Sequence, residues 1–370
     1  MRTRAAILHE VGKPWSVEEI DLDPPQRGEV LVRLAAAGMC RSDEHVMTGD
    51  LPNRLPVIGG HEGAGIVEEV GEGVESVRPG DHVVFGFIPS CGRCPSCVSG
   101  HGNLCDLGAH LADGFQVSDH TARHHLHGED LALMCLVGSF AEHTVVNEAT
   151  CIKLPPDAPL DVACLLGCGV VTGWGSAVYA GGIRPGDDVV VVGVGGIGIN
   201  AVQGAVSAGA RHIVAIDPVA FKREQALAFG ATHVAADLDD AFELVRDATE
   251  GRMAKAVIMS LSTGRGDLVA SALKLTGKRG RVVITSIHPV AETEVAMSAW
   301  DLSLMEKQVV GSLFGSASPR VDILRLWNLH RAGQLRLDDL ITRRYRLDEV
   351  NAGYQDLRDG RNLRGIIDFT

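Results

Sequence analysis

The sequence predicts an α/β protein with two domains, a β-rich first part and a doubly wound parallel sheet after it. Three observations support this class. The first 90 residues contain short β-rich runs separated by Pro and Gly. From about Pro185, apolar strands alternate with helical stretches, which is typical of βαβ units that cover both faces of a sheet. The length of 370 residues exceeds a typical domain of about 100–200.

Residue patterns predict the elements in chain order. Apolar runs indicate strands at 29–35, 65–70 and 81–85 in the first part. The second part has expected strands at 188–193, 212–217, 256–259 and 281–285, and helices at 196–208 and 221–229. A helix at 320–331 and a strand at 365–368 follow, and this strand could rejoin the first part. The expected domains are 1–169 with 314–370, and 170–313.

Composition and charge exclude several classes of protein. The chain has 34 Lys and Arg against 47 Asp and Glu, a net charge of −13, so we expect no nucleic-acid or membrane partner. The stretches 162–183 and 189–210 are uncharged and long enough to span a membrane, but six glycines in each argue against a span. An odd set of nine cysteines and no recognisable signal segment predict a cytoplasmic protein with free thiols.

A glycine-rich turn connects the first strand of the parallel sheet to its helix. In Gly193-Val-Gly-Gly-Ile-Gly198, Gly193 makes the sharp turn, Gly195 lets the backbone approach a pyrophosphate, and Gly198 brings helix and strand together. Gly196 belongs to the same cofactor-binding run. The start of a helix attracts phosphate groups. Strand, glycine run and helix in this order predict a dinucleotide site.

An acidic residue ends the next strand of this unit. Asp217 lies 19 residues after Gly198. Its carboxylate suits two ribose hydroxyls and would repel a 2′-phosphate, so the sequence favours NAD over NADP. Lys222 could add a hydrogen bond there, or could be a solvated helix residue. The sequence leaves both readings of Lys222 open.

Four cysteines lie within 15 positions of a loop rich in Gly, Pro and Ser. They are Cys91, Cys94, Cys97 and Cys105. Closely spaced thiolates can enclose a tetrahedral zinc ion with no open position, as structural zinc sites do. A disulfide pair is disfavoured by the expected compartment, and an iron–sulfur cluster usually has other spacings. We therefore predict a structural zinc site.

Three further motifs are weak individually and informative together. They are Gly38-Met-Cys40-Arg-Ser-Asp-Glu-His45, Gly60-His61-Glu62-Gly-Ala-Gly65 and Leu165-Leu-Gly-Cys168-Gly. With the glycine run, the cysteine loop and the later Val70-Gly-x-Gly-Val74 and Gly80-Asp-x-Val83, they resemble the zinc-dependent medium-chain alcohol dehydrogenase family along the whole chain. The resemblance implies a GroES-like catalytic domain and a Rossmann cofactor domain.

The resemblance also implies a second, catalytic zinc ion. Its ligands would be Cys40, His61 and Cys168, with a fourth position open to water or alcohol. Asp43 would accept a hydrogen bond from the ligand imidazole and fix its tautomer. Glu62 could approach the metal during ligand exchange. Two Zn²⁺ ions per chain are therefore expected.

Other family positions imply proton transfer and cofactor binding. Ser42 and His45 correspond to the proton relay that accompanies hydride transfer between the alcohol and NAD. Four more positions match cofactor contacts: Arg41 and Arg364 for the pyrophosphate, and Thr172 and Ile197 beside the nicotinamide. For Arg364 a surface ion pair is the alternative, and Ser42 and His45 could be ordinary structural residues.

Four runs resemble one subgroup more closely, the bacterial nicotinoproteins assayed with N,N-dimethyl-4-nitrosoaniline (NDMA). The runs are 193–204, 217–223, 311–315 and 354–360. They imply that NAD stays bound and is reoxidised in place by another acceptor, with mycofactocin expected in the cell. The alternatives are an ordinary NAD-dependent alcohol dehydrogenase, a thiol-dependent formaldehyde dehydrogenase with exchangeable NAD, or a non-catalytic NAD-binding homologue. Members of the last class tend to lose zinc ligands.

Some residues stay outside these motifs. Cys135, Cys151 and Cys164 have no partner at ligand spacing, so we expect them to pack in the interior. Segment 110–127 has five histidines without a strand or helix period, which predicts a surface excursion, with an adventitious metal site as the alternative. The family pairs subunits through the edge strand of the cofactor domain, which makes 307–314 the candidate contact in a dimer or tetramer. The substrate would be a small alcohol or aldehyde.

Overall fold

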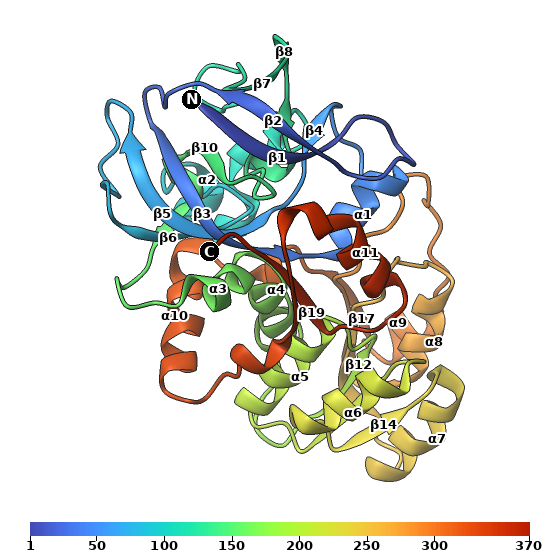
Figure 1. Ribbon diagram of the computed structural model, residues 1–370. Coiled ribbons are helices and arrows are strands. Elements are labelled where there is room, and N and C mark those ends of the chain that lie inside the picture. The colour runs from blue at the N-terminus through green and yellow to red at the C-terminus, as the bar shows by residue number, and fades with distance from the viewer. The chain divides into compact units, whose positions relative to one another are not determined.

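The computed structural model describes all residues from Met1 to Thr370 (Figure 1). The chain forms two compact units. The first contains Met1–Cys168 and Ser318–Thr370, and the second contains Gly169–Ala317. Each unit has sheets of its own, so the residues that a sheet brings together belong to one unit.

The second unit is built on a six-stranded sheet in which every neighbouring pair is parallel. Its order is β14 (His233–Ala235), β13 (His212–Ile216), β12 (Asp188–Val192), β15 (Ala254–Met259), β16 (Thr276–Ile284) and β17 (Gln308–Gly311). Its helices are α4 (Gly169–Gly175), α5 (Gly198–Ser207), α6 (Ala220–Ala228), α7 (Leu238–Ala248), α8 (Leu268–Lys274) and α9 (Ala299–Leu304). The predicted parallel sheet is confirmed, and one strand, β14, and four helices, α4, α7, α8 and α9, were missed from the sequence.

Burial explains why this sheet has such apolar strands. Val189–Val192 of β12 are all buried, as are Ile213–Ile216 of β13. A strand in the middle of a parallel sheet is covered on both faces, so it lacks the alternation of a half-exposed strand. α7 begins where the side chain of Asp237 accepts hydrogen bonds from two backbone N–H groups, which caps the helix.

The first unit contains two sheets. One has the order β8 (Glu129–Asp130), β7 (His124–Leu126), β2 (Ser16–Leu22), β1 (Arg2–Leu8), β4 (Val57–Ile58) and β9 (Ala132–Leu133). The other has the order β11 (Cys151–Lys153), β6 (His82–Phe85), β5 (Glu62–Val70), β3 (Glu29–Met39), β19 (Arg364–Asp368) and β18 (Ile341–Tyr345), with β10 (His143–Asn147) also paired to β3. The helices are α1 (Arg41–Thr48), α2 (Pro95–Val98), α3 (Leu160–Ala163), α10 (Pro319–Arg331) and α11 (Val350–Arg358).

The last strand of the chain returns to the first unit, as the sequence suggests. β19, dark red in Figure 1, pairs antiparallel with the blue β3, so that Gly365 lies opposite Met39. β3 is the longest strand and ends one residue before Cys40. The C-terminal strand therefore supports the strand that leads into the first zinc motif.

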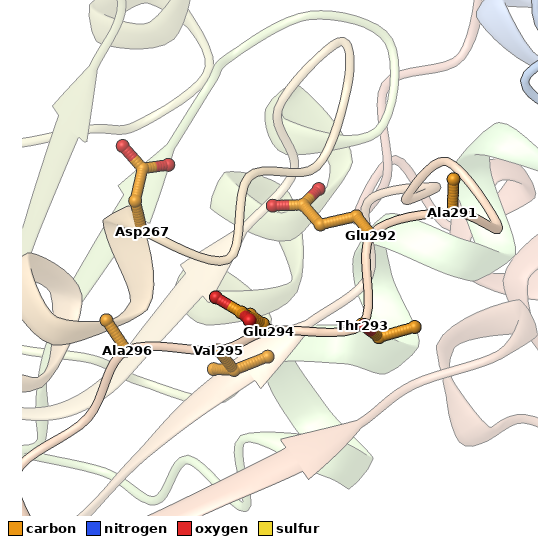
Figure 2. Close-up of a pocket in the computed structure, with 7 residues that line it drawn as sticks. All are labelled: Asp267, Ala291, Glu292, Thr293, Glu294, Val295 and Ala296. Carbon is orange, nitrogen blue, oxygen red and sulfur yellow. The ribbon is translucent and has the colours of Figure 1, made fainter.

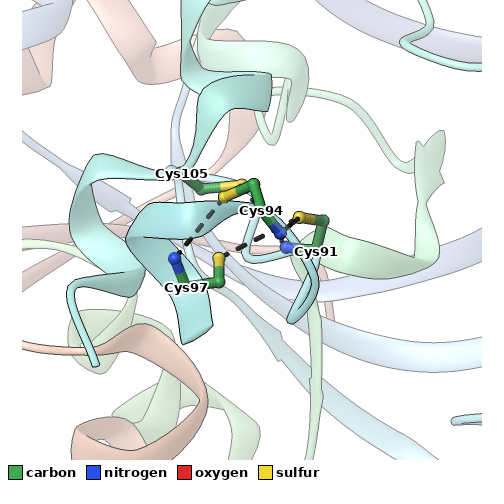
Figure 3. Close-up of side chains that lie close together, drawn as sticks. All are labelled: Cys91, Cys94, Cys97 and Cys105. Carbon is green, nitrogen blue, oxygen red and sulfur yellow. Dashed lines mark hydrogen bonds between the residues drawn. The ribbon is translucent and has the colours of Figure 1, made fainter. Parts of the chain in front are cut away.

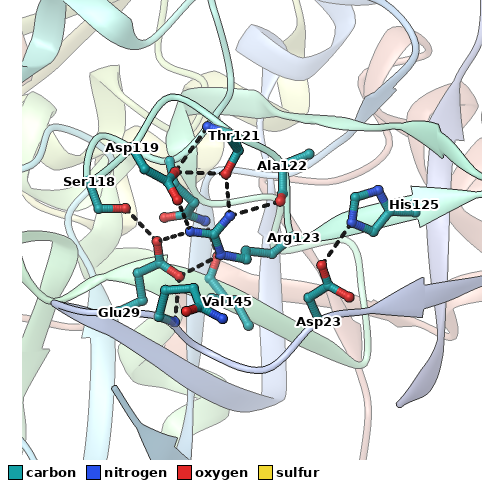
Figure 4. A network of polar contacts seen from close by, with 11 residues as sticks. Asp23, Glu29, Ser118, Asp119, Thr121, Ala122, Arg123, His125 and Val145 are labelled. Atoms are coloured by element: carbon teal, nitrogen blue, oxygen red, sulfur yellow. Dashed lines mark hydrogen bonds and ion pairs between the residues drawn. The ribbon is translucent and has the colours of Figure 1, made fainter. Parts of the chain in front are cut away.

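Segment 110–127 is not the simple surface excursion that its sequence predicts. Its end forms β7, in which His124 is fully buried, and the preceding Arg123 is only 4% exposed. Arg123 donates two hydrogen bonds of 2.8 Å to the buried carboxylate of Glu29, and a third to Asp119 (Figure 4). A buried charge is tolerated when it is paired. This ion pair fixes the segment to the start of β3.

No single helix of the structure is long and apolar enough to cross a membrane. Only the helical stretches Leu160–Gly167 and Gly169–Ala180 reach the required length and hydropathy, and they do so as a pair broken at Cys168. Most of their side chains are buried inside the protein. Interior packing accounts for their apolar composition.

Candidate zinc and dinucleotide sites

The four cysteines of the loop converge. The sulfur atoms of Cys91, Cys94, Cys97 and Cys105 all lie within 4.8 Å of one another (Figure 3). Backbone N–H groups point at these sulfurs, among them that of Cys94, 3.4 Å from Sγ of Cys91. Although burial opposes it, such hydrogen bonds from Arg93 and Cys94 lower the pKa of Cys91 to about 7. Four sulfurs that converge on one point fit a closed tetrahedral zinc site.

The dispersed motifs also meet at one place. Cys40, His61, Glu62 and Cys168 are buried, and one ligand atom from each lies within 4.8 Å of the others. Cys40 precedes α1, His61 precedes β5, and Cys168 ends the first stretch of the unit. A hydrogen bond from Cys168 holds the pKa of Cys40 well below its ordinary value, which favours the thiolate that binds metal.

One nitrogen of His61 is left for a metal. Its Nδ1 lies 3.0 Å from Oδ1 of Asp43, whereas the buried Nε2 has no hydrogen-bond partner. Asp43 is fully buried and also accepts hydrogen bonds of 3.1 Å from the N–H groups of Gly60 and Cys40. A carboxylate held in this way fixes the imidazole tautomer, as expected beside a metal ligand. Two sulfurs and a bare imidazole nitrogen fit zinc with one position open.

Glu62 lies beside the three predicted ligands and pairs with Arg364. Burial raises the pKa of Glu62 above its ordinary value. Arg364 is 3% exposed, so the ion pair is a buried one and not the surface pair considered as an alternative. Arg41 pairs with Glu44, which also accepts from Arg358 at 3.2 Å. The role of both predicted arginines toward a pyrophosphate stays a prediction.

The predicted relay residues lie on α1. Oγ of Ser42 is 3.6 Å from Sγ of Cys40. His45 is 3% exposed, and its Nδ1 lies 3.1 Å from Oδ2 of Asp50, a residue that the sequence reading missed. The side chain of Asp50 is 32% exposed, so it connects the buried imidazole to water.

Two glycines of the turn between β12 and α5 are required by the backbone geometry, and a third lies beside open space. Gly193 has φ +83°, which favours glycine, and a Cβ on Gly198 would lie 1.9 Å from the carbonyl oxygen of Gly193. A Cβ on Gly195 would contact only Nζ of Lys222, at 3.9 Å. The backbone is therefore tightly packed at Gly193 and Gly198. At Gly195 there is open space, and the ammonium group of Lys222 lies nearby. An open backbone cradle beside a positive charge fits a phosphate.

The other predicted cofactor residues of the second unit lie around this turn. Asp217 is 4% exposed and accepts hydrogen bonds from the N–H of Val194 at 3.0 Å and of Val219 at 2.9 Å. Thr172 lies on α4, which packs closely on α5, since a Cβ on Gly173 would be 2.1 Å from the carbonyl oxygen of Ile197. The structure therefore gathers the acid, the turn and the α4 residue in one region of the unit.

Two family models match the chain, the Alcohol dehydrogenase GroES-like domain over residues 26–156 and the Zinc-binding dehydrogenase over residues 196–328. The chain belongs to the zinc-dependent medium-chain alcohol dehydrogenase family. It is 51% identical to the NDMA-dependent alcohol dehydrogenase of Amycolatopsis methanolica over 367 residues, 99% of both chains.

Solved structures of this alcohol dehydrogenase family have the same fold. An alcohol dehydrogenase zinc-binding domain protein from Burkholderia ambifaria has a TM-score of 0.93, is 32% identical, and the match covers 100% of this chain and 99% of that one. Benzyl alcohol dehydrogenase from Acinetobacter calcoaceticus has a TM-score of 0.92, is 28% identical, and the match covers both chains fully. The GroES-like and Rossmann folds are confirmed, and the chain is an oxidoreductase, not a non-catalytic homologue.

An aromatic residue next to the predicted catalytic zinc of this dehydrogenase was missed from the sequence. The ring of Phe87 stands edge-on to that of His61, with centroids 5.6 Å apart and an interplanar angle of 90°. Phe87 lies two residues after the end of β6. Its place just after a predicted strand is the sequence signal that could have indicated it. Its ring contributes an apolar wall to the ligand cluster.

A separate cavity lies in the second unit of the dehydrogenase (Figure 2). Its volume is about 610 Å³, and it is lined by Asp267 and residues 291–296. No predicted site residue contributes to it. Three carboxylates line the cavity, and one of them belongs to Glu292. Its Oε1 accepts a hydrogen bond from the N–H of Gly266, so this side chain connects two loop segments.

Proposed function

We propose that this alcohol dehydrogenase transfers a hydride between an alcohol or aldehyde and an NAD molecule that stays bound and is reoxidised by a separate acceptor. The observation that carries the proposal is the 51% identity, over 99% of both chains, with an enzyme named for its dependence on NDMA. We assign zinc chemistry to residues 1–169 with 314–370, and NAD binding to 170–313. The four-cysteine loop would hold a second, structural zinc ion.

The chain's own groups provide the proton steps. Zinc at Cys40, His61 and Cys168 would supply a Lewis acid that lowers the pKa of an alcohol hydroxyl. Ser42, which lies beside Cys40, accepts the hydroxyl proton in this proposal. His45 passes it toward Asp50 and water, because its imidazole is within hydrogen-bond distance of that exposed carboxylate.

The remaining groups hold and select the cofactor. Asp217 would accept hydrogen bonds from the ribose hydroxyls, and its negative charge disfavours the 2′-phosphate of NADP. Lys222, close to Gly195, would neutralise phosphate charge. Arg41 and Arg364 keep their proposed role toward the pyrophosphate, and Glu62 its proposed role during exchange of the zinc ligand.

The test is the NAD content of the purified protein. The protein is desalted, denatured and analysed for NAD(H), and a second sample is assayed with an alcohol and NDMA without added NAD. We expect about one NAD(H) per chain and turnover with NDMA alone. An empty protein that turns over rapidly on added NAD would instead support an ordinary dehydrogenase. Dependence on a small thiol and formaldehyde would support the formaldehyde dehydrogenase alternative.

We also propose that subunits pair through β17, which lies at one edge of its sheet and has only β16 as a neighbour. The unpaired backbone groups of an edge strand can pair with a second chain. Nearby Trp300 and Leu304 are 64% and 59% exposed, apolar area that a partner would cover. Sedimentation of the wild type and Trp300→Glu tests this, and a monomeric wild type would refute it.

A further inference from the structure

A buried amide lies two residues after the glycine run. Asn200 on α5 is fully buried, and its Nδ2 donates a hydrogen bond of 2.8 Å to the carbonyl of Gly196. In a regular α-helix the backbone N–H of residue 200 would bind this carbonyl. Here the backbone N–H of Asn200 instead donates a hydrogen bond of 3.0 Å to the carbonyl oxygen of Ile197. The side chain of Asn200 therefore supplies the hydrogen bond that the backbone omits.

This bond sets the direction of one peptide group. The carbonyl of Gly196 and the N–H of Ile197 belong to the same planar trans peptide, so they point in opposite directions. Because Asn200 holds the carbonyl toward the helix, the N–H of Ile197 points away from it. The adjoining Gly195 has its open side near Nζ of Lys222. An outward N–H at the start of a helix is the group that binds a phosphate oxygen.

A second buried amide fixes the first. Gln203 is 6% exposed, and its Nε2 donates a hydrogen bond of 3.0 Å to Oδ1 of Asn200. With Oδ1 occupied by this donor, the NH₂ group of Asn200 faces Gly196. The hydrogen-bonded chain from Gln203 through Asn200 to Gly196 orients the turn before any ligand arrives.

We infer that Asn200 is a positioning residue for the pyrophosphate of the dinucleotide, and that Gln203 holds Asn200 in place. The inference rests on the proposed NAD site. A turn that is already oriented has less freedom to lose on binding, so NAD is held more tightly. Asn200 and Gln203 thus contribute to retention of NAD without touching it.

Two small substitutions separate the hydrogen bond from packing. Asn200→Ala removes the donor, whereas Asn200→Ser leaves a similar cavity but restores a donor to the carbonyl four residues back. Ser207 makes such a bond in the same helix, from Oγ to the carbonyl of Gln203 at 2.9 Å. Ser207→Ala is the matched control, because it removes a side-chain bond of the same type far from the turn.

The readout is the rate at which bound NAD(H) leaves the purified holoenzyme into buffer with excess ADP-ribose. We expect Asn200→Ala to release NAD roughly tenfold faster than the wild type, which is the effect of about one hydrogen bond. Asn200→Ser and Ser207→Ala should release NAD at a rate close to that of the wild type. Equal rates for Asn200→Ala and Asn200→Ser would overturn the inference. Should Asn200→Ala not fold, Gln203→Leu is measured instead and should release NAD faster than the wild type, by less than tenfold. An unchanged rate in Gln203→Leu overturns the inference as well.

The same series distinguishes the inference from the proposed function. If NAD exchanges freely, the order of the variants is read from their dissociation constants for NADH. A wild type that binds neither NADH nor ADP-ribose would refute the dinucleotide site itself. A wild type that binds both, with no difference among the variants, would refute only the role of Asn200.

Discussion

The carboxylate of Asp43 and the imidazole of His61 form a buried hydrogen bond, with Oδ1 3.0 Å from Nδ1. The same carboxylate accepts the backbone N–H of Cys40. One side chain thus orients two of the three proposed ligands of the catalytic zinc, although it is not a ligand itself. A ligand that is held in place before the metal arrives loses less freedom on binding it.

Asp43→Asn is expected to lower zinc affinity about 10- to 100-fold, because the amide holds the tautomer of His61 less firmly. Zinc content after competition with a chelator measures the effect. Asp50→Asn is the control, since Asp50 contacts the proposed relay residue His45 and no ligand. Equal zinc retention by the Asp43 variant and the wild type would contradict this role of Asp43.

Loss of one thiol from the four-cysteine loop should remove one zinc ion per chain. In Cys94→Ser we expect zinc to fall from two ions to one and the thermal midpoint to drop, because a structural zinc ion stabilises the loop around it. Cys164→Ser is the control, because its Sγ bonds to the carbonyl of Asp161 and lies outside both clusters. Two zinc ions in the Cys94 variant would argue against the site.

The ion pair between Arg123 and Glu29, which belongs to neither ligand cluster, predicts a large effect on stability. Arg123→Met leaves the fully buried Glu29 without its partner, so the free energy of unfolding should fall by about 3–5 kcal/mol. Arg246→Met removes an exposed pair with Glu243 and should cost less than about 1 kcal/mol. Urea unfolding measures both, and similar effects would mean that burial does not set the cost.

His124 should make the protein acid-sensitive. Burial lowers its pKa to about 3 from an ordinary 6.5, so below pH 6.5 the unfolded chain binds a proton that the folded chain does not. Its contribution to stability is therefore complete above pH 6.5 and is lost progressively as the pH falls toward 3, by about 1.4 kcal/mol per pH unit.

The variant His124→Gln should flatten this dependence of unfolding free energy on pH. Urea midpoints measured between pH 7 and pH 4 report the slope. His233→Gln, at a half-exposed position, should retain the slope of the wild type. A His124 variant with the wild-type slope would show that other groups cause the acid sensitivity.

The fold was readable from the sequence where local pattern and tertiary structure agree. The apolar run after Asp188 and the glycine run after it predicted β12 and α5 closely. β3 extends to Met39, beyond the predicted end at residue 35, because β5 and β19 pair with the residues Ala36–Met39, which carry no β-branched side chain. Partner strands, which a local pattern does not contain, set that boundary.

Spacing indicated the four-cysteine cluster and the family resemblance indicated the cluster of Cys40, His61 and Cys168, but neither indicated the contacts between distant side chains. Glu62 and Arg364 lie 302 residues apart and Glu29 and Arg123 lie 94 apart, and neither pair leaves a local signal. Cys135 and Cys151, in contrast, are buried as the sequence predicts. Burial raises their pKa values to about 11 and about 12, in keeping with the predicted packing role.

The pairing of β19 with β3 has a consequence for synthesis on the ribosome. The second unit is one continuous stretch, so all of its strands have been made before Ser318. The sheet that leads to Cys40 lacks the neighbour of Met39 until Gly365 has emerged. Domains tend to fold as units during synthesis. The nascent first unit must therefore keep its ligand-bearing strand incompletely paired while the whole second unit is made, so the sheet beside Cys40 is among the last parts of the protein to be completed.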